Sequence, residues 1–317
     1  FTTDAQHILT GVTNAAGTLT LNGGTLAQAV TGAGSTQITG AVTNSSTIAN
    51  NVSIASTGTL TSDIADLTGT VTNAGSFLMS GDLDKDIAGA GTTTLNTDTH
   101  ITANNSIAGT LNLNNHVVDM QNNPAQYNTL SVGNLTGSGT LKIDANMANA
   151  GGVATASDKI HLTNGSATNA TLDLTSINVT NNGTDSPTVY NDFLTYLDGT
   201  GADDITYLLA GSTTGTLRTD TADHKYFFTL GSDGKLNVLI REAVTTLPQF
   251  IQGDNMETVA STYSINENMA LAEDVGTTYR EGSASKNLTV DINNGAILSS
   301  DGHQGITVDS GYSLDLE

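Results

Sequence analysis

Closely spaced carboxylates are the groups in this sequence whose types and spacing come nearest to catalytic chemistry. Asp82, Asp84 and Asp86 stand at alternate positions in GDLDKD, and Asp203 and Asp204 are neighbours. Two carboxyl groups can share acid–base work, including glycoside cleavage, when their surroundings separate their pKa values. Both groups occur in turn-like sequence, and no Arg or Lys stands in an obvious partnering motif. We therefore predict that they are solvated corner residues and that they form no catalytic site.

The segment DLDKD also resembles the start of a calcium-binding loop, but it departs from the EF-hand pattern. Counted from Asp82, position 6 is Ile87 and position 12 is Thr93, whereas the loop requires Gly and Glu there. The histidines are dispersed, without the HExxH or paired spacing of zinc sites. They are His7, His100, His116, His161, His224 and His303. The sequence therefore predicts no metal site and no cofactor.

The motifs rich in glycine and serine match neither a phosphate-binding loop nor the nucleophile elbow of a serine hydrolase. Gly32–Gly34 and Gly89–Gly91 are not phosphate loops, because no Lys-Ser or Lys-Thr follows them. GNLTGSGTL lacks the strand–turn–helix context of a nucleophile elbow. No enzymatic activity is predicted from these motifs.

Composition restricts the possible partners. Of the 317 residues 13% are charged and 4% aromatic, Cys and Trp are absent, and the net charge is -22. Because such a polyanion repels phosphate groups, binding to nucleic acid or to an anionic membrane surface is disfavoured. Without Cys there is no disulfide and no thiol site. No run of about 18 apolar residues is present, so no transmembrane segment is expected in this sequence.

The elements that carry these residues are short strands that recur along the first part of the chain. Similar strand starts are GTLTL at 17, STQIT at 35, NVSIA at 51, GTVTN at 69, GTTTL at 91 and GTLNL at 109, with spacings of 18, 16, 18, 22 and 18 residues. Strands this short do not form stable hairpins alone, and the period is too short for a helical repeat or a propeller blade. The pattern predicts one coil of a parallel β-solenoid per repeat, with about three strands in each coil.

In such a coil the aliphatic residues point inward, Gly, Asn and Asp form corners, and Thr faces solvent. An antiparallel β-sandwich is the alternative, because turns every 8–12 residues fit part of the chain. The repeated G-T-φ-T-φ strand start, where φ is apolar, favours the solenoid because its spacing is nearly constant.

The pattern changes near residue 127. Strand-like segments lengthen from YNTLSVGNLTGSGTLKIDANM to HKYFFTLGSDGKLNVLI, and most aromatic residues gather there. GSDG at Gly231–Gly234 is typical of a tight hairpin turn. An open solenoid end would expose apolar side chains and unpaired strand edges. We predict that this segment forms a hairpin-rich cap on the coils.

These residues resemble the C-terminal passenger region of bacterial autotransporters, the type V secretion proteins. The similarity covers about 127–240 and rests on YNTLSV with LxGSGTL, on SDKI at Ser157–Ile160 and on the closing FxLxxDGxLxV pattern. In that family the region follows a right-handed parallel β-helix and, as an autochaperone, helps the passenger to fold at the outer membrane. The resemblance implies a right-handed parallel β-helix with an autochaperone-like cap, in an exported extracellular or cell-surface protein. It also implies a non-enzymatic role in adhesion or structural extension.

A set of residues is expected to hold the cap and the apolar ladder. They are Tyr127, Leu130, Leu135, Gly137, Gly139, Leu141, Ile143, Asp158, Ile160, Leu162, Phe228, Leu230, Gly234, Leu236 and Val238. Expected partners are a protein or glycan of a host or neighbouring cell, or further copies of the chain.

Four segments are predicted: β-solenoid coils in 1–126, the autochaperone-like cap in 127–240, an irregular connector in 241–282 and the start of further coils in 283–317. In the family a linker helix and a membrane barrel follow the cap, so the new coil-like strands are a departure. A chain that ends on a starting coil would suit head-to-tail stacking into an extracellular fibre, which is one alternative function. A polysaccharide-degrading β-helix enzyme that uses Asp203 and Asp204 is the other.

Overall fold

The structure, a computed structural model, describes residues 1–123, 126–146, 156–181, 188–194, 197–198, 205–220, 224–230 and 236–242, and beyond these only five short strands between 262 and 316. Two compact units are distinguished, Phe1–Arg241 and Glu242–Glu317. Each is described by itself.

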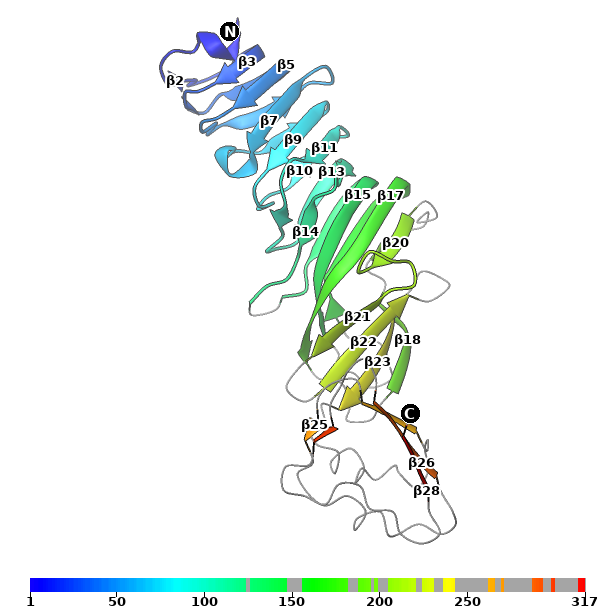
Figure 1. Cartoon of the computed structure of the whole chain (residues 1–317). Helices are drawn as coiled ribbons and strands as arrows, with labels where there is room; N and C mark the ends of the chain where they lie inside the picture. The colour runs from blue at the N-terminus through cyan, green and yellow to red at the C-terminus, as the bar shows by residue number, and fades with distance from the viewer. Residues whose placement is uncertain are drawn as a thin grey trace. The chain divides into compact units, whose positions relative to one another are not determined.

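The first unit is a parallel β-helix, as the sequence predicts (Figure 1). Its first face contains β1 (Thr2–Thr3), the first halves of β3 (Thr18–Leu26), β5 (Ser35–Asn44) and β13 (Asn105–Asn112), and β6 (Asn51–Ile54), β8 (Val71–Asn73) and β10 (Ile87–Ala88). The second face contains the second halves of β3, β5 and β13 with β7 (Thr59–Asp63), β9 (Ser76–Ser80) and β11 (Thr92–Leu95). The third face contains β2 (Val12–Thr13), β4 (Val30–Thr31), β12 (Thr99–His100) and β14 (Val117–Asp119). Two 3-10 turns, η1 (Ala5–His7) and η2 (Ile64–Asp66), are the only helical elements among the described residues.

The core consists of inward-facing residues that stack on their equivalents one coil away. On the second face Val42 pairs with Leu60, and Leu60 pairs with Phe77, and all three are at most 2% exposed. Each fully buried aliphatic or aromatic side chain contributes about 1.5–3 kcal/mol through the hydrophobic effect. Some buried polar side chains form hydrogen bonds to the next coil, as where Asn73 Nδ2 donates to Thr92 O at 3.0 Å. The apolar positions of the repeat are therefore the ladders of the solenoid.

A column of glycines includes the first residue of two G-T-φ-T-φ strand starts, Gly91 and Gly109. The column contains Gly40, Gly58, Gly75, Gly91, Gly109 and Gly133. A Cβ on Gly91 would lie 2.5 Å from Gly75 O, and one on Gly109 would lie 2.0 Å from Gly91 O. Because no side chain fits between these stacked backbones, glycine is required by close approach.

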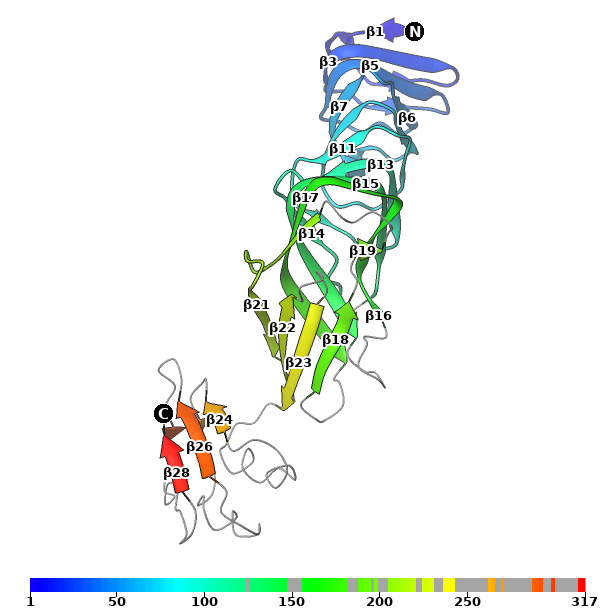
Figure 2. The same cartoon turned by 90° about the vertical axis from the view of Figure 1, so that its right-hand side faces the viewer.

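Coils lengthen toward the end of the solenoid. Positions paired between neighbouring coils are 17 residues apart at Thr18 and Ser35, 25 apart at Asn105 and Leu130, and 30 apart at Val132 and Leu162. The extra length lies in β15 (Thr129–Asn146) and β17 (Lys159–Asn181), two long strands that pair in parallel throughout with four register shifts. Figure 2 shows them as wide arcs below the thinner coils. The parallel stack therefore continues well past residue 127.

An antiparallel sheet follows the last coils. Its strand order is β18 (Thr188–Leu194), β23 (Leu236–Glu242), β22 (His224–Leu230) and β21 (Thr216–Asp220). Three short strands lie before or beside it, namely β16 (Ala156–Ser157), β19 (Leu197–Asp198) and β20 (Ile205–Leu209). The rings of Tyr226 and Phe228, both 0% exposed, stack with centroids 6.4 Å apart. The predicted GSDG turn, Gly231–Gly234, lies outside the described residues, but β22 and β23 are neighbours in the sheet.

The second unit contains two small parallel sheets. One has the order β24 (Thr262–Ile265), β26 (Asn287–Ile292) and β28 (Ser313–Leu316), and the other pairs β25 (Met269–Ala270) with β27 (Leu298–Ser299). Parallel pairing at intervals of one coil is the same pattern as in the first unit. Two of these strands, β24 and β25, fall within 241–282, the segment expected to be an irregular connector.

Candidate functional site

The acidic corner residues singled out in the sequence bind the backbone of the next coil. Asp82 Oδ1 accepts a hydrogen bond from His100 N at 3.0 Å. Asp86 Oδ1 accepts from Ser106 N at 2.7 Å and from Ser106 Oγ at 2.9 Å. Asp84 is exposed and lies 3.5 Å from Lys85 Nζ. Two of the three carboxylates therefore join coils, while Asp203 and Asp204 lie outside the described residues.

The same contact recurs elsewhere, and we call it the inter-coil brace: an Asp or Asn oxygen that accepts an N–H from the following coil. Asn51 binds Thr70 N at 3.1 Å, Asp98 binds Val117 N at 2.9 Å and Asn104 binds Thr129 N at 2.7 Å. The bond from Val117 is the main influence that lowers the pKa of the Asp98 carboxyl. Sequence reasoning placed Asp and Asn at corners but missed the brace, because its partner is a whole coil away.

Two fully buried carboxyl groups stand where the long strands begin and end. Asp158, just before β17, accepts backbone N–H bonds from Asn128 to Oδ1 and from Asp144 to Oδ2, both at 2.6 Å. Asp144, near the end of β15, accepts from Asn122 N at 2.8 Å and from Asn178 Nδ2 at 2.6 Å. Both side chains are 0% exposed. This acid pair, Asp144 and Asp158, therefore ties together the segment after β14, strand β15 and strand β17.

Burial dominates the electrostatics of the acid pair. It raises the pKa of Asp158 to about 7, against the opposing effect of the two backbone hydrogen bonds, and the negative charge of Asp144 adds to the rise. Burial also raises the pKa of Asp144, opposed by the bonds from Asn122 and Asn178. A carboxyl group that titrates near pH 7 could donate a proton in catalysis. Here neither side chain reaches solvent, so neither can touch a substrate in this arrangement.

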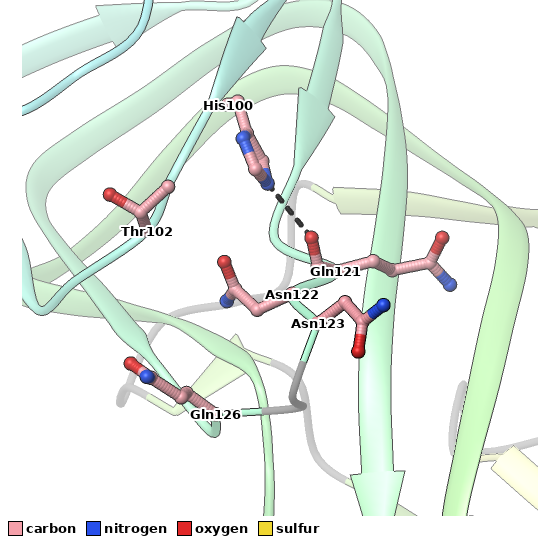
Figure 3. Close-up of a pocket in the computed structure, with 6 residues that line it drawn as sticks. All are labelled: His100, Thr102, Gln121, Asn122, Asn123 and Gln126. Carbon is pink, nitrogen blue, oxygen red and sulfur yellow. Dashed lines mark hydrogen bonds between the residues drawn. The ribbon is translucent and has the colours of Figure 1, made fainter.

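A pocket of about 550 Å³ lies beside the acid pair (Figure 3). It is lined by His100, Thr102, Gln121, Asn122, Asn123 and Gln126. His100 Nε2 donates to Gln121 O at 2.8 Å, a contact drawn in Figure 3. Asn122 contributes to both features, because its backbone N–H binds Asp144 while its side chain faces the pocket. The acid pair therefore holds in place the backbone at Asn122, which lines the pocket.

No protein-family model and no curated protein sequence matches this chain. In the described part of the chain, no group of three or more His, Asp or Glu side chains is placed to hold a metal ion. Over the same residues no helix has the length and apolar character required to cross a membrane.

The residues expected to hold the ladder and cap lie as follows. Leu130, Leu135, Leu141, Ile143, Ile160, Leu162, Asp158 and Phe228 are at most 2% exposed. Tyr127 and Leu230 are partly buried. Gly137 has a positive φ of 74°, and a Cβ there would lie 2.3 Å from Asn112 Oδ1, while at Gly139 it would lie 2.8 Å from His116 O. Leu236 and Val238 belong to β23, and Gly234 lies outside the described residues.

Asp158 is the one predicted residue with a distinctive chemical environment, and the sequence placed it only through the SDKI motif. Its partner Asp144 was not singled out. No local signal marked it, because Asp144 occupies a polar position in the alternating run GTLKID and is nevertheless buried. Asp144 and Asp158 together connect the segment after β14, strand β15 and strand β17 by hydrogen bonds. The pocket lies next to this pair.

Proposed function

We propose that this chain is a non-enzymatic structural and adhesive segment of an exported bacterial surface protein, similar to an autotransporter passenger. The observation that carries the proposal is the continuity of β15 and β17. These two strands pair with the coils on one side and lead into the antiparallel sheet on the other, so one element joins a repetitive rod to a cap with a richer core.

The burial of apolar side chains favours an autochaperone-like role for the region that contains β15 and β17. Each thin coil contacts only its neighbours, so a partly formed stack has an exposed apolar end. The two long strands, in contrast, bury a dense set of aliphatic side chains against each other, including Leu130 on Ile160 and Leu141 on Leu174. A region with that much local burial can fold first and then offer an edge on which thinner coils pair. Such an order suits a protein that folds as it leaves a membrane.

An adhesive role is supported by the outer surface of the second face. Two columns of outward-facing residues run along this face, and each contains one residue per coil. The first column consists of Ala41, Thr59, Ser76, Thr92, Thr110, Asn134 and Ser166. The second consists of Thr43, Thr61, Leu78, Thr94, Asn112, Thr136 and Thr168. Neither column contains a charged residue, although the chain carries a net charge of -22. A long array of hydroxyl and amide groups can make many weak contacts at once, which raises the total affinity through avidity.

Refolding kinetics of the full chain test the folding role. Leu172→Ala in β17 and Leu60→Ala in β7 remove side chains that are both 0% exposed, so the two variants are a matched pair. If the long coils form the nucleus, Leu172→Ala slows refolding, whereas Leu60→Ala mainly speeds unfolding. Pulse-labelling hydrogen exchange would protect amides of β15 and β17 before those of β5 and β7. Refolding slowed by Leu60→Ala alone, with early protection of the thin coils, would refute the proposal.

A further inference from the structure

We propose that the pocket beside the acid pair is a binding site for a neutral sugar unit. This inference rests on the proposed surface role for its biological setting and extends it by naming a site and a ligand class. The pocket volume of about 550 Å³ lies within the range of sites that hold small molecules.

The open hydrogen-bonding groups of the lining carry the argument. Thr102, Asn123 and Gln126 make no side-chain hydrogen bond within the described part of the chain, and Asn122 uses only its Nδ2, which donates to Met120 O at 2.9 Å. Amide and hydroxyl side chains offer both donors and acceptors. A sugar ring presents neighbouring hydroxyl groups that likewise donate and accept, so the two sets are complementary.

The floor of the pocket is held in place before any ligand arrives. Gln121 Nε2 donates to Ile143 O and contacts Ser176 Oγ, each at 3.0 Å. The backbone N–H groups of Gln121 and Asn122 bind Asp119 Oδ1 at 3.0 Å and Asp144 Oδ2 at 2.8 Å. A lining fixed by its own hydrogen bonds loses less freedom on binding, which favours affinity.

Charge selects the ligand class. No Asp, Glu, Lys or Arg lines the pocket, and the titratable side chain there, His100, donates from Nε2 to Gln121 O. Behind the lining, Asp119 Oδ2 pairs with Lys142 Nζ at 3.1 Å, and the Asp144 carboxyl is bound by Asn122 N and Asn178 Nδ2. Because the cation among these groups is already paired, nothing there favours a uronate or a sulfated sugar over a neutral one. A cation would find no carboxylate in the lining itself. The lining contains no Phe, Tyr or Trp on which a sugar ring could stack, so we expect a Kd of about 1–10 mM for a monosaccharide.

Saturation-transfer difference NMR on the full chain tests this site. The probes are methyl glucoside, methyl galactoside and N-acetylglucosamine as neutral sugars, with glucuronate as the anionic comparison. The variant Thr102→Val/Gln126→Leu removes two open polar groups from exposed positions. The control is Thr72→Val, at an exposed position of β8 on the first face, away from the pocket and from the threonine columns. We expect transfer to at least one neutral sugar, a loss of affinity of about tenfold in the double variant, and no change in Thr72→Val.

Three outcomes would overturn the inference: no transfer to any neutral sugar at about 20 mM, which exceeds the expected Kd; equal transfer in the double variant and the wild type; or glucuronate binding as strongly as the neutral sugars. Loss of transfer in Thr72→Val alone would move sugar binding to the first face of the solenoid and would also count against the pocket. Unchanged refolding kinetics in the variants keep this result separate from the test of the folding role.

Discussion

Asp158 makes the stability of the long coils around β15 and β17 depend on pH near neutrality. Its pKa is about 7 in the folded chain, whereas the ordinary value of an Asp carboxyl is 3.8. Between these values the folded state binds more protons than the unfolded state, so the stability contributed by this group is fully present below pH 3.8 and is lost as the pH rises toward 7. Three pKa units at 1.36 kcal/mol each give an upper figure of about 4 kcal/mol.

The variant Asp158→Asn separates this effect from the general repulsion of a chain with a net charge of -22. The amide cannot ionise, so the pH dependence due to this position disappears. Its NH₂ group, however, would face one of the two backbone N–H donors, from Asn128 or Asp144, and leave it unpaired. An unsatisfied buried donor costs about 1–3 kcal/mol. We therefore expect Asp158→Asn to be less stable than the wild type at pH 4 and to approach or exceed it at pH 8.

Urea unfolding followed by far-ultraviolet circular dichroism, at several pH values from 4 to 8, measures the difference. Asp84→Asn is the matched control, because Asp84 is exposed and its replacement removes one carboxylate without disturbing a buried contact. The control should lose stability with rising pH as steeply as the wild type. Equal slopes in wild type and Asp158→Asn, or a wild type that gains stability from pH 4 to 7, would refute the reasoning about burial.

Three further predictions concern the coils and the cap. Gly91→Ala forces a Cβ to within 2.5 Å of a neighbouring carbonyl oxygen and should lower the free energy of unfolding by about 3 kcal/mol, whereas Gly11→Ala, with its nearest contact at 3.6 Å, should be nearly neutral in thermal unfolding. Asp98→Asn should make the thin coils less sensitive to acid. A carboxyl group with a lowered pKa stabilises the fold above its unfolded pKa, and this stabilisation is lost as the pH falls. An unchanged acid-unfolding midpoint in hydrogen exchange would contradict this. Phe228→Ala should cost about 3–5 kcal/mol and release the antiparallel sheet from protection, and a loss confined to the thin coils would argue against its place in the cap core.

The parallel β-helix could be predicted from the sequence because each coil repeats one local pattern. The alternation in GTLTL and GTTTL decides which side chains point inward, and the spacing of the strand starts sets the coil length. Glycine at the start of the pattern was expected to form a corner with unusual backbone angles. Its actual reason at Gly91 and Gly109 is contact with the backbone of the preceding coil, which no local pattern reveals.

The braces and the acid pair could not be predicted because they depend on residues that meet only after the coils stack. Asp86 and Ser106 are 20 residues apart, and Asn128 and Asp158 are 30 apart. In both contacts one partner is a backbone N–H, which every residue other than proline possesses. Nothing in the sequence therefore marks which N–H is used. The lengthening of the coils at β15 and β17 is equally non-local, since a longer strand and a longer loop have similar composition in this chain.

The glycine column also determines how such a rod can change in size. Because Gly75, Gly91 and Gly109 each touch the backbone next to them, a coil that lost or gained one or two residues would put a side chain where only hydrogen fits. A complete coil that carries its own glycine and its own brace meets no such obstacle, because it presents the same two surfaces above and below. Insertions and deletions should therefore be tolerated in units of one coil, each worth about 4.8 Å of length, and a designer could adjust the reach of this protein in those steps.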